Sequence, residues 1–403
     1  MFNDTIERIV SGMRVTGKLH LGHFHGVIKN WLELQNEYEC FFFAADLHGL
    51  TTNYENPKSI PLQTLDMVAD WLAAGINPHQ AKIFIQSWVP EHTELHLLLS
   101  MITPLSWLER VPSYKDQKLN LTDKDLDTYG FLGYPVLQAA DILIYKAHLV
   151  PVGEDQIPHI ELTREIARRF NYLYGQEEDF EKKALLALNK LGKKNAELYK
   201  EFRRRFQEEG DKEALTMTEA LLDQQKNLFL ADQERLLGYM SGTTKIILPE
   251  PKPLITKNSK LLGLDGQKMS KSLKNTISLG EDFKEIERKI NTMPTDPARI
   301  RRNDPGDPEK CPVWDFHKIY SDPNTQKWVQ EGCRSASIGC LECKRTLIDA
   351  IEKEQAPIRE RALEYQNNRQ LLKDILHDGA DAARTAARET LSEIKEVMGL
   401  EMD

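Results

Sequence analysis

The sequence predicts an α/β catalytic domain with a doubly wound parallel sheet, a helical insertion and an all-helical C-terminal domain. Residues 1–175 alternate short apolar runs with longer amphipathic segments. This alternation is typical of a parallel sheet covered by helices on both faces. A second observation is that no strand pattern follows residue 285, whereas helical patterns continue to the end of the chain. Together these features indicate a Rossmann-like domain followed by helices.

Four short runs in the first part of the chain are nearly continuous in apolar residues, as in strands buried on both faces. They are Arg8–Ser11, Cys40–Ala45, Lys82–Gln86 and His148–Val152. Between these runs, apolar residues recur at helical spacing. The spacing marks two expected helices, one with Phe24, Ile28, Trp31 and Gln35 on a face and the next with Leu65, Val68 and Leu72.

The chain divides into four expected parts. Residues 1–175 form the catalytic domain. Residues 176–245 are rich in charges, and we interpret them as a solvated helical insertion in which Gly210 separates two helices. Residues 246–285 are rich in Pro, Gly and Lys and complete the catalytic region. Residues 286–403 form the helical C-terminal domain, whose last helix has an apolar face made of Ala387, Leu391, Ile394 and Met398.

Length and composition exclude several function classes. The chain has 403 residues, enough for two or three domains, and a formal net charge of −9. This charge argues against a general nonspecific nucleic-acid binder, and we expect no DNA partner. No run reaches the ~18 consecutive apolar residues that a membrane span needs, and the first residues carry acids without an apolar signal core. We therefore expect a cytoplasmic protein with no membrane partner.

The first motif is SGMRVTGKLHLGHFHG, Ser11–Gly26. It joins an expected strand to a helix that opens at about Leu21. Glycines in such a turn let the backbone approach a phosphate group, and the helix N-terminus supplies N–H donors and a positive dipole. His20 and His23 are three residues apart, so both side chains are able to face one ligand, and an imidazole donor there stabilises charge on a phosphoryl group. Alone, two histidines at a helix start also occur by chance.

The second motif is GLDGQKMSKSLKNTI, residues 263–277. We expect a loop in which Lys268, Ser270 and Lys271 neutralise and orient a pyrophosphate leaving group. Two lysines on a surface are usually only solvated. The string KMSKS about 245 residues after HLGH is far more specific. The pair predicts an enzyme that binds ATP and joins a small carboxylic acid to AMP.

HLGH and KMSKS resemble the HIGH and KMSKS signatures of class I aminoacyl-tRNA synthetases. The segment GYPVLQAADILIYKAHLVPVGEDQIPHIELTREIARRFN, Gly133–Asn171, closely resembles the tryptophanyl-tRNA synthetase family. The resemblance covers most of the chain apart from the insertion. It implies a homodimer that uses ATP and Mg²⁺ to make tryptophanyl-adenylate from L-tryptophan and then acylates the 3′ end of tRNA(Trp). The catalytic residues that it implies are His20, His23, Lys268, Ser270 and Lys271.

The resemblance also implies an ATP site, residue by residue. Besides the two signatures, it includes the turn after the first strand, the GED turn near the ribose and an apolar residue near the adenine. The implied ATP-binding residues are Arg14, Val15, Thr16, Gly22, His23, Gly153, Glu154, Asp155, Leu261, Lys268, Met269, Ser270, Lys271 and Ser272. An alternative role for Glu154 and Asp155 is to cap the helix that we expect to start near Ile157.

The implied tryptophan-binding residues are Tyr134, Gln138, Asp141 and Gln156. Tyr134 and Gln156 match positions near the substrate amino group, and Asp141 matches the carboxylate that binds the indole. Gln138 stands where several family members have methionine. The neighbours of Asp141 are apolar, and a carboxylate is costly to bury without a partner. A substrate N–H donor would be that partner, while a surface position at a helix end is the alternative.

Four of the five cysteines lie in one region, with the spacing C-x21-C-x6-C-x2-C, at Cys311, Cys333, Cys340 and Cys343. Their clustering favours a shared metal over separate buried thiols. Structural zinc usually has two close cysteine pairs and only one exists here, whereas iron–sulfur clusters tolerate unequal spacing. Some tryptophanyl-tRNA synthetases have a nearly identical pattern, with a first gap one residue longer, that holds a 4Fe-4S cluster in the anticodon-binding domain. We expect a 4Fe-4S cluster rather than zinc. We also expect Arg334, Lys344 and Arg345, which lie beside these cysteines, to form a basic surface for RNA phosphates.

Other functions share parts of these patterns. A tyrosine–tRNA ligase has the same fold and signatures. A nucleotidyltransferase of the pantothenate synthetase type also has an HxGH turn, but it does not need a helical C-terminal domain with four cysteines. A non-catalytic tRNA-binding paralogue is disfavoured because both phosphate motifs are intact.

Overall fold

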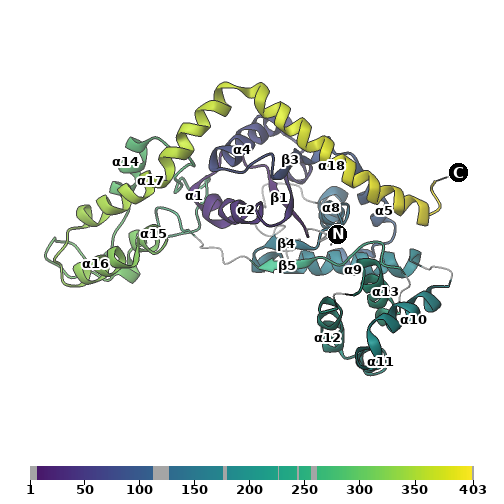
Figure 1. Cartoon of the computed structure of the whole chain (residues 1–403). Helices are drawn as coiled ribbons and strands as arrows, with labels where there is room; N and C mark the ends of the chain where they lie inside the picture. Colours follow the sequence, from purple (N-terminus) through teal and green to yellow (C-terminus); the bar gives the residue numbers. More distant parts are fainter. Residues whose placement is uncertain are drawn as a thin grey trace. The chain divides into compact units, whose positions relative to one another are not determined.

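The protein is an α/β structure built on one five-stranded sheet (Figure 1). The computed structural model describes residues 7–111, 127–175, 179–225, 227–242, 245–255 and 261–401. The sheet has the strand order β3-β2-β1-β4-β5. β1 pairs with β4 and β2 with β3, both in parallel. This confirms the predicted parallel α/β fold. The strands are β1 (Arg8–Arg14), β2 (Glu39–Ala45), β3 (Ala81–Ile85), β4 (Leu149–Val152) and β5 (Lys252–Ile255).

All four predicted strands are present, and the fifth strand was not predicted. β5 lies at the edge of the sheet order, and the side chains of its four residues are exposed or half-buried. It also contains Pro253, which removes a backbone donor. A short edge strand of this kind lacks the continuous apolar run that marks a central strand.

The chain forms two compact units. The first comprises Ser11–Val89 and Ile255–Ala383, and the second comprises Glu7–Val10, Pro90–Leu254 and the chain from Arg384 onward. HLGH, KMSKS and the four clustered cysteines all lie in the first unit. The four-part division of the sequence stays a prediction.

The core of the first unit is aromatic. The Trp31 ring stacks on the Phe42 ring with centroids 4.3 Å apart, and Trp71 meets Trp31 edge to face at 5.0 Å. All three side chains are fully buried, which fixes the helices against β2. The helices of this part are α1 (Leu21–His23), the π-helix η1 (Phe24–Ile28), α2 (Lys29–Leu34), α3 (Asp46–Leu50) and α4 (Ile60–Ala74), with 3₁₀ turns at Pro57–Ser59 and Gln86–Trp88.

From residue 283 onward the described chain contains helices joined by turns and no strand, as predicted. α17 packs against α4, α14 and α15 within the first unit. The last helix, α18, begins well before Ala387, the first residue of the apolar face from which it was predicted. Gly379 lies inside this helix and does not interrupt it. The helices are α14 (Phe283–Thr292), α15 (Pro312–Tyr320), α16 (Pro323–Arg334), α17 (Cys340–Asn367) and α18 (Arg369–Val397), with a 3₁₀ turn at Pro308–Lys310.

The second unit carries the helices α5 (Glu91–Ser100), α6 (Leu105–Glu109), α8 (Tyr129–Leu143) and α9 (Ile157–Tyr174), with a 3₁₀ turn at Glu154–Gln156. α8 packs against α5 and α9. Among the described residues, no helix is long and apolar enough to cross a membrane.

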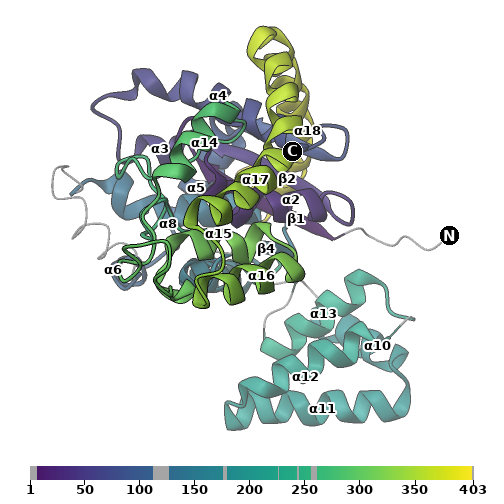
Figure 2. The same ribbon diagram turned by 90° about the vertical axis from the view of Figure 1, so that its left-hand side faces the viewer.

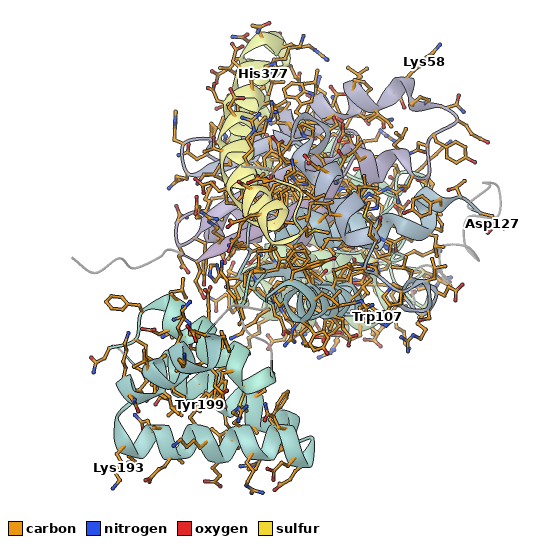
Figure 3. The ribbon with its side chains drawn as sticks, turned by 90° about the vertical axis from the view of Figure 1, so that its right-hand side faces the viewer. Lys58, Trp107, Asp127, Lys193, Tyr199 and His377 are labelled. Carbon is orange, nitrogen blue, oxygen red and sulfur yellow. The ribbon has the colours of Figure 1, made fainter. Side chains whose placement is uncertain are left out.

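The charged segment after α9 is a helical bundle with a core of its own (Figure 2). Its helices are α10 (Phe180–Lys190), α11 (Gly192–Glu209), α12 (Lys212–Asp223) and α13 (Leu230–Ser241). Gly210 ends α11 in a left-handed conformation with φ of +68°, as its predicted role as a helix separator requires. Tyr199 is fully buried between the helices, where its hydroxyl donates to the Leu236 carbonyl at 2.5 Å, while Lys193 points away (Figure 3).

Candidate active site

The HLGH motif lies at the strand-to-helix turn that its sequence predicts. β1 ends at Arg14, Gly17 adopts a left-handed φ of +71°, and α1 begins at Leu21. The rings of His20 and His23 stack with centroids 3.7 Å apart. The backbone N–H of His20 donates to Nδ1 of His23 at 3.3 Å, so the proton of a neutral His23 resides on Nε2. His20 Nδ1 is buried, and no described residue forms a hydrogen bond with it.

Both signature histidines are uncharged at neutral pH. Burial, followed by the charge of Lys271, lowers the pKa of His20 to about 4. Burial, His20 and Lys271 together lower the pKa of His23 to about 3. Each imidazole is therefore a hydrogen-bond donor or acceptor here and not a cation.

The residues after HLGH form a π-helix, Phe24–Ile28, a rare turn that often marks functional sites. It buries His25, whose Nε2 lies 2.8 Å from the Tyr320 hydroxyl and 3.3 Å from Glu354 Oε1. The Tyr320 hydroxyl also donates to Glu354 Oε1 at 3.0 Å. We call these three residues the His25 cluster. It links the first signature to α15 and α17.

The KMSKS loop is organised by Asn275, which the sequence analysis missed. Its side-chain oxygen accepts from the Ser270 N–H at 2.8 Å, and its amide donates to Asp265 Oδ1 at 2.8 Å and to the Lys268 carbonyl at 3.1 Å. A Cβ at Gly263 would lie 2.2 Å from that amide nitrogen, so the close packing requires glycine. The motif at residues 263–277 contains this asparagine, and a buried asparagine in a loop usually forms hydrogen bonds with backbone groups.

The two signatures meet in the first unit. The Gly22 N–H donates to Met269 Sδ at 3.3 Å. The Leu21 N–H donates to the Ile277 carbonyl at 3.0 Å. Lys271 Nζ donates to the Thr16 carbonyl in the turn after β1. Segments about 250 residues apart thus surround one turn that is suited to phosphate.

The other predicted ATP residues of this unit lie around the same turn or loop. Arg14 bonds to the Thr52 hydroxyl, and Val15 and Leu261 are buried. Ser270 and Ser272 bond to each other through their hydroxyls at 2.8 Å.

The remaining predicted residues belong to the second unit and are described by themselves. Gly153 precedes the 3₁₀ turn Glu154–Gln156, and α9 begins at Ile157 as predicted. The capping residue of α9 is Gln156, whose side chain makes no cap hydrogen bond and donates to Asp155 Oδ2 at 3.1 Å. The alternative capping role of Glu154 and Asp155 is thus not seen, and both side chains are exposed.

Asp141 is buried, as predicted, but it is not a lone carboxylate. It is 1% exposed, and its Oδ1 lies 2.6 Å from Nδ1 of His92 in α5. His92 Nε2 lies 2.6 Å from the hydroxyl of Tyr145, so the three side chains form a buried chain of hydrogen bonds. Burial, followed by Asp141 and Glu91, raises the pKa of Tyr145 well above its usual value. His92 thus supplies a partner within the protein, so the burial of Asp141 does not require a substrate, and its role in binding the indole stays a prediction.

Tyr134, Gln138 and Asp141 lie on one face of α8, since they are four and three residues apart. The Tyr134 ring lies against the rings of Phe131 and His159, with both centroid distances 5.7 Å. No spacing rule in the sequence pointed to His92, which lies 49 residues before Asp141.

The four clustered cysteines converge within the first unit. Cys311 precedes α15, Cys333 lies in α16, and Cys340 and Cys343 open α17. Burial, followed by the other three thiols, raises the pKa of Cys343 to about 12. Cys343 Sγ lies 3.3 Å from His317 Nε2, and Cys333 Sγ lies 3.8 Å from Arg299 Nη1. In the described chain, no group of three or more His, Cys, Asp or Glu side chains is arranged to hold a metal ion.

The expected basic surface beside these cysteines is partly wrong. Lys344 is buried, and its ammonium donates to the carbonyls of Asn291 at 2.8 Å and Met293 at 2.7 Å. It helps to fix α17 and is not available to RNA. Arg334 is exposed, and Arg345 pairs with Glu287 at 3.0 Å on the surface.

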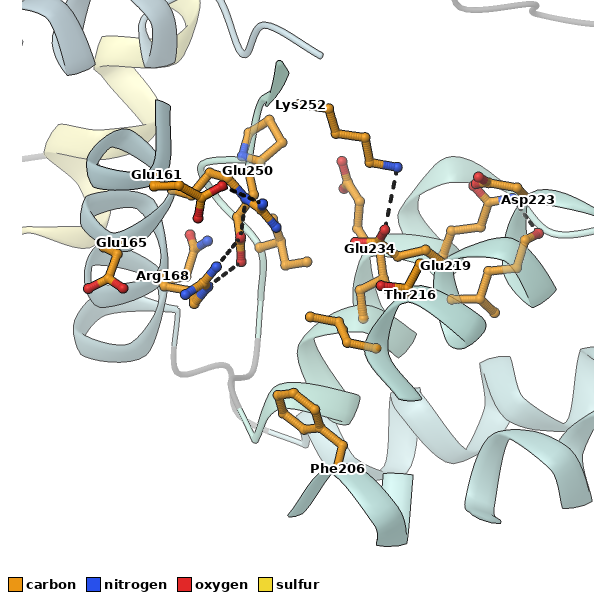
Figure 4. Close-up of a pocket in the computed structure, with 18 residues that line it drawn as sticks. Glu161, Glu165, Arg168, Phe206, Thr216, Glu219, Asp223, Glu234, Glu250 and Lys252 are labelled. Carbon is orange, nitrogen blue, oxygen red and sulfur yellow. Dashed lines mark hydrogen bonds and ion pairs between the residues drawn. The ribbon is translucent and has the colours of Figure 1, made fainter. Parts of the chain in front are cut away.

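A cavity of about 490 Å³ lies elsewhere, between α9, the insertion helices and residues 246–252 (Figure 4). Glu250 there accepts two hydrogen bonds from Arg168, both at 2.8 Å, and Arg164 donates to it at 3.1 Å. None of the predicted site residues lines this cavity.

Known proteins share this arrangement over nearly the whole chain. The family described as tRNA synthetases class I (W and Y) matches residues 4–197 and 213–355. The chain is 61% identical to the tryptophan–tRNA ligase of Ralstonia nicotianae over 98% of both chains. It is 43% identical to that of Thermotoga maritima, covering 98% of this chain and 99% of the relative.

Solved structures agree. The tryptophanyl-tRNA synthetase of Campylobacter jejuni, complexed with ADP and tryptophan, has a TM-score of 0.73 and 28% identity and covers 98% of this chain and 100% of its own. With the family match spanning both signatures and the relatives spanning the whole fold, the chain belongs to the class I tRNA synthetases of the W and Y family.

Proposed function

We propose that the protein is a tryptophan–tRNA ligase. It activates L-tryptophan with ATP to tryptophanyl-adenylate and transfers the amino acid to the 3′ end of tRNA(Trp). The observation that carries this proposal is the meeting of HLGH and KMSKS around one turn, through Gly22, Met269, Thr16 and Lys271. The names of the relatives at 61% and 43% identity support tryptophan as the amino acid.

The adenylation step is an in-line displacement at the α-phosphorus. A carboxylate oxygen of tryptophan forms the new bond to phosphorus, the bond to the bridging oxygen of the β-phosphate breaks, and pyrophosphate leaves. Lys268 and Lys271 neutralise the leaving pyrophosphate, and the neutral histidines donate hydrogen bonds to the phosphoryl oxygens. Mg²⁺, when bound with ATP, supplies further charge neutralisation. In the second step a terminal ribose hydroxyl of the tRNA attacks the carbonyl carbon and AMP leaves.

The ATP-binding residues that we propose are those that the family resemblance implies. The turn after β1 and the two signatures bind the phosphates, Gly153, Glu154 and Asp155 bind the ribose, and Leu261 contacts the adenine. These assignments rest on the family resemblance and on the turn geometry of HLGH.

The tryptophan pocket that we propose uses the face of α8 that carries Tyr134, Gln138 and Asp141, together with Gln156. An indole N–H is a donor only, so its recognition needs an acceptor, and Asp141 is the acidic member of the set. Membership in the W and Y family leaves tyrosine as the alternative substrate and disfavours the nucleotidyltransferase of the pantothenate synthetase type.

The test is ATP–pyrophosphate exchange with each of the twenty amino acids. We expect exchange with tryptophan alone. Exchange that depends on tyrosine would favour the alternative, and no exchange with any amino acid would contradict the proposal.

We propose a 4Fe-4S cluster as the occupant of the cysteine region, with zinc as the alternative. Four half-buried thiols are the ligand set that such a cluster takes, and Cys311, Cys333 and Cys340 act together on the pKa of Cys343. Arg299 beside Cys333 offsets negative charge. Anaerobically purified protein is expected to be brown, with iron and sulfide near four each per chain. Stoichiometric zinc without iron would favour the alternative.

We propose that the enzyme is a cytoplasmic homodimer. The second unit exposes large apolar side chains on α5 and α6, which both pack against α8, on α8 itself and directly after α5. They are Leu97 (56%), Met101 (67%), Leu105 (62%) and Tyr129 (66%). Such a patch suits a second copy of the chain. Replacing Met101 and Leu105 by Glu is expected to yield a monomer in analytical ultracentrifugation. A wild-type monomer at micromolar concentration would contradict the proposal.

A further inference from the structure

We propose that Asp70 is a positioning residue for adenylation: its buried carboxylate fixes the backbone before HLGH and holds Lys271 beside the phosphate-binding turn. The inference rests on the proposed role of Lys271 in binding ATP. Asp70 lies in the middle of α4, outside both signatures.

The position of Asp70 is unusual for an acid. It is 6% exposed, and its neighbours in α4, Ala69, Trp71 and Leu72, are all buried. Its Oδ2 accepts a hydrogen bond from the Leu19 N–H at 2.6 Å. Leu19 directly precedes His20, so α4 fixes the point at which the signature begins. A buried carboxylate is tolerated only with such partners, and a neutral side chain would fill the same space at lower cost.

The second partner of Asp70 is electrostatic. Its charged neighbours among the described residues are Lys18, Asp66 and Lys271. Lys271 Nζ donates to the Thr16 carbonyl and lies 3.8 Å from the place of a Cβ at Gly17. Partial burial lowers the pKa of Lys271, and Asp70 opposes this effect. Asp70 therefore favours the charged form of the Lys271 side chain in the turn.

Among the described residues, Asp70 is the acid whose charge raises the pKa of Lys271. The same lysine lowers the pKa of His20 and His23, which are neutral and supply no counter-charge. Asp66, the remaining acid, pairs with Arg369 at 3.6 Å.

Because Asp70 is buried, its pKa is raised to about 7, with Asp66 adding to the rise and the Leu19 N–H, Lys18 and Lys271 opposing it. Asp70 thus gains its charge as pH rises through neutrality and loses it as pH falls. The electrostatic attraction between Asp70 and Lys271 therefore strengthens as pH rises and weakens as pH falls. The pH profile of kcat/KM for ATP should therefore fall as pH drops through neutrality, because Asp70 becomes protonated. We call this part of the profile the acid limb.

The decisive variant is Asp70→Asn, which keeps an oxygen for the Leu19 N–H but removes the charge. We expect kcat/KM for ATP in pyrophosphate exchange to fall about tenfold at about pH 8, as for other close coupled pairs. The KM for tryptophan and the Tm should change little, and the acid limb should disappear. The matched control is Asp66→Asn, one turn earlier in α4, which should leave kcat/KM at that pH unchanged.

A double-mutant cycle with Lys271→Ala separates this inference from the proposed function. If Asp70 acts through Lys271, Asp70→Asn has little further effect in the Lys271→Ala background. Equal losses in both backgrounds, or an unchanged pH profile in Asp70→Asn, overturn the inference. Full activity of Lys271→Ala overturns the proposed role of the lysine instead. If Asp70→Asn does not fold, the pH profile of kcat/KM for ATP is measured in Lys271→Ala instead. An acid limb that persists in this variant overturns the inference.

Discussion

At the scale of single residues, the site separates neutral donors from cations. His20 and His23 have pKa values of about 4 and about 3, so they carry no charge at neutral pH. In the ATP site that we propose, the positive charge for a triphosphate comes from Arg14, Lys268, Lys271 and backbone N–H groups. Neutral imidazoles supply directed hydrogen bonds without repelling Lys271, so both histidines and this lysine lie around one turn.

Lys271→Ala is expected to lower kcat for adenylation far more than affinity for tryptophan. The lysine stabilises the leaving pyrophosphate in the transition state, and the loss of one such donor typically costs about 100-fold or more. Pre-steady-state adenylate formation is the measurement, and Lys274→Ala, at the end of the same loop, is the control. Unchanged rates would show that the KMSKS lysine does not act on the leaving group.

Asp141→Ala is expected to raise the KM for tryptophan and to lower the ratio of kcat/KM for tryptophan to kcat/KM for phenylalanine. The KM for ATP should change little. Phenylalanine offers no N–H donor to Asp141, and pockets built around such a hydrogen bond reject analogues that lack it. The measurement is kcat/KM for both amino acids. An unchanged ratio would mean that Asp141 does not bind the indole N–H.

His92 adds a second expectation for the same variant. Removal of Asp141 leaves the buried His92 Nδ1 without its partner at 2.6 Å. Unfolding free energy should fall by about 1–3 kcal/mol for this reason. Gln138→Met, on the same face of α8, is the control. It should retain both the unfolding free energy and the ratio of kcat/KM for tryptophan to kcat/KM for phenylalanine.

At the scale of elements, close packing depends on single glycines. In α18, a Cβ at Gly379 would lie 2.0 Å from the Ile83 carbonyl oxygen of β3, which is backbone and cannot turn aside. The helix therefore lies directly on the strand. In α8, by contrast, a Cβ at Gly130 would meet nothing within 4 Å.

Gly379→Ala is expected to lower the stability of the first unit by about 1–3 kcal/mol or more through overpacking. Gly130→Ala, also in a helix, should leave stability unchanged or raise it by up to about 1 kcal/mol. Thermal and urea unfolding of both variants measure the difference. Equal stability of the two would contradict the packing argument.

Elements with a strong local pattern could be predicted from the sequence. The four apolar strands and the start of α9 follow from runs and turns that a sequence displays. β5 could not, because an exposed edge strand with a proline lacks that pattern. Asp70 and His92 were missed, and the role of Lys344 was predicted wrongly, for a different reason. Their partners lie far away in the sequence, at Leu19, Asp141 and the carbonyls of Asn291 and Met293, and only folding brings them together.

At the scale of the whole molecule, one unit contains both phosphate motifs and the four cysteines. The cysteines nevertheless lie on α15, α16 and α17, which contribute no predicted ATP residue. We therefore assign them a role in docking tRNA rather than in adenylation.

Cys340→Ser is expected to impair the charging of tRNA(Trp) while sparing much of the ATP–pyrophosphate exchange. The reason is that a lost ligand disturbs the cysteine region, whereas the phosphate turn keeps its own contacts. Cys40→Ala, which removes the remaining thiol in β2, is the control for both assays. Equal loss of the two activities would contradict a separate docking role.

The His25 cluster has a consequence for how the molecule opens. His25 lies two residues after HLGH, and Tyr320 and Glu354 lie on α15 and α17. Cys311 directly precedes α15, and Cys343 lies in the first turn of α17. Breaking any of these buried bonds exposes polar groups of three elements at once. The amide protons of the π-turn and of the adjoining parts of α15 and α17 should therefore exchange with solvent in a single cooperative opening. Tyr320→Phe should speed exchange in all three segments together, and not in α15 alone.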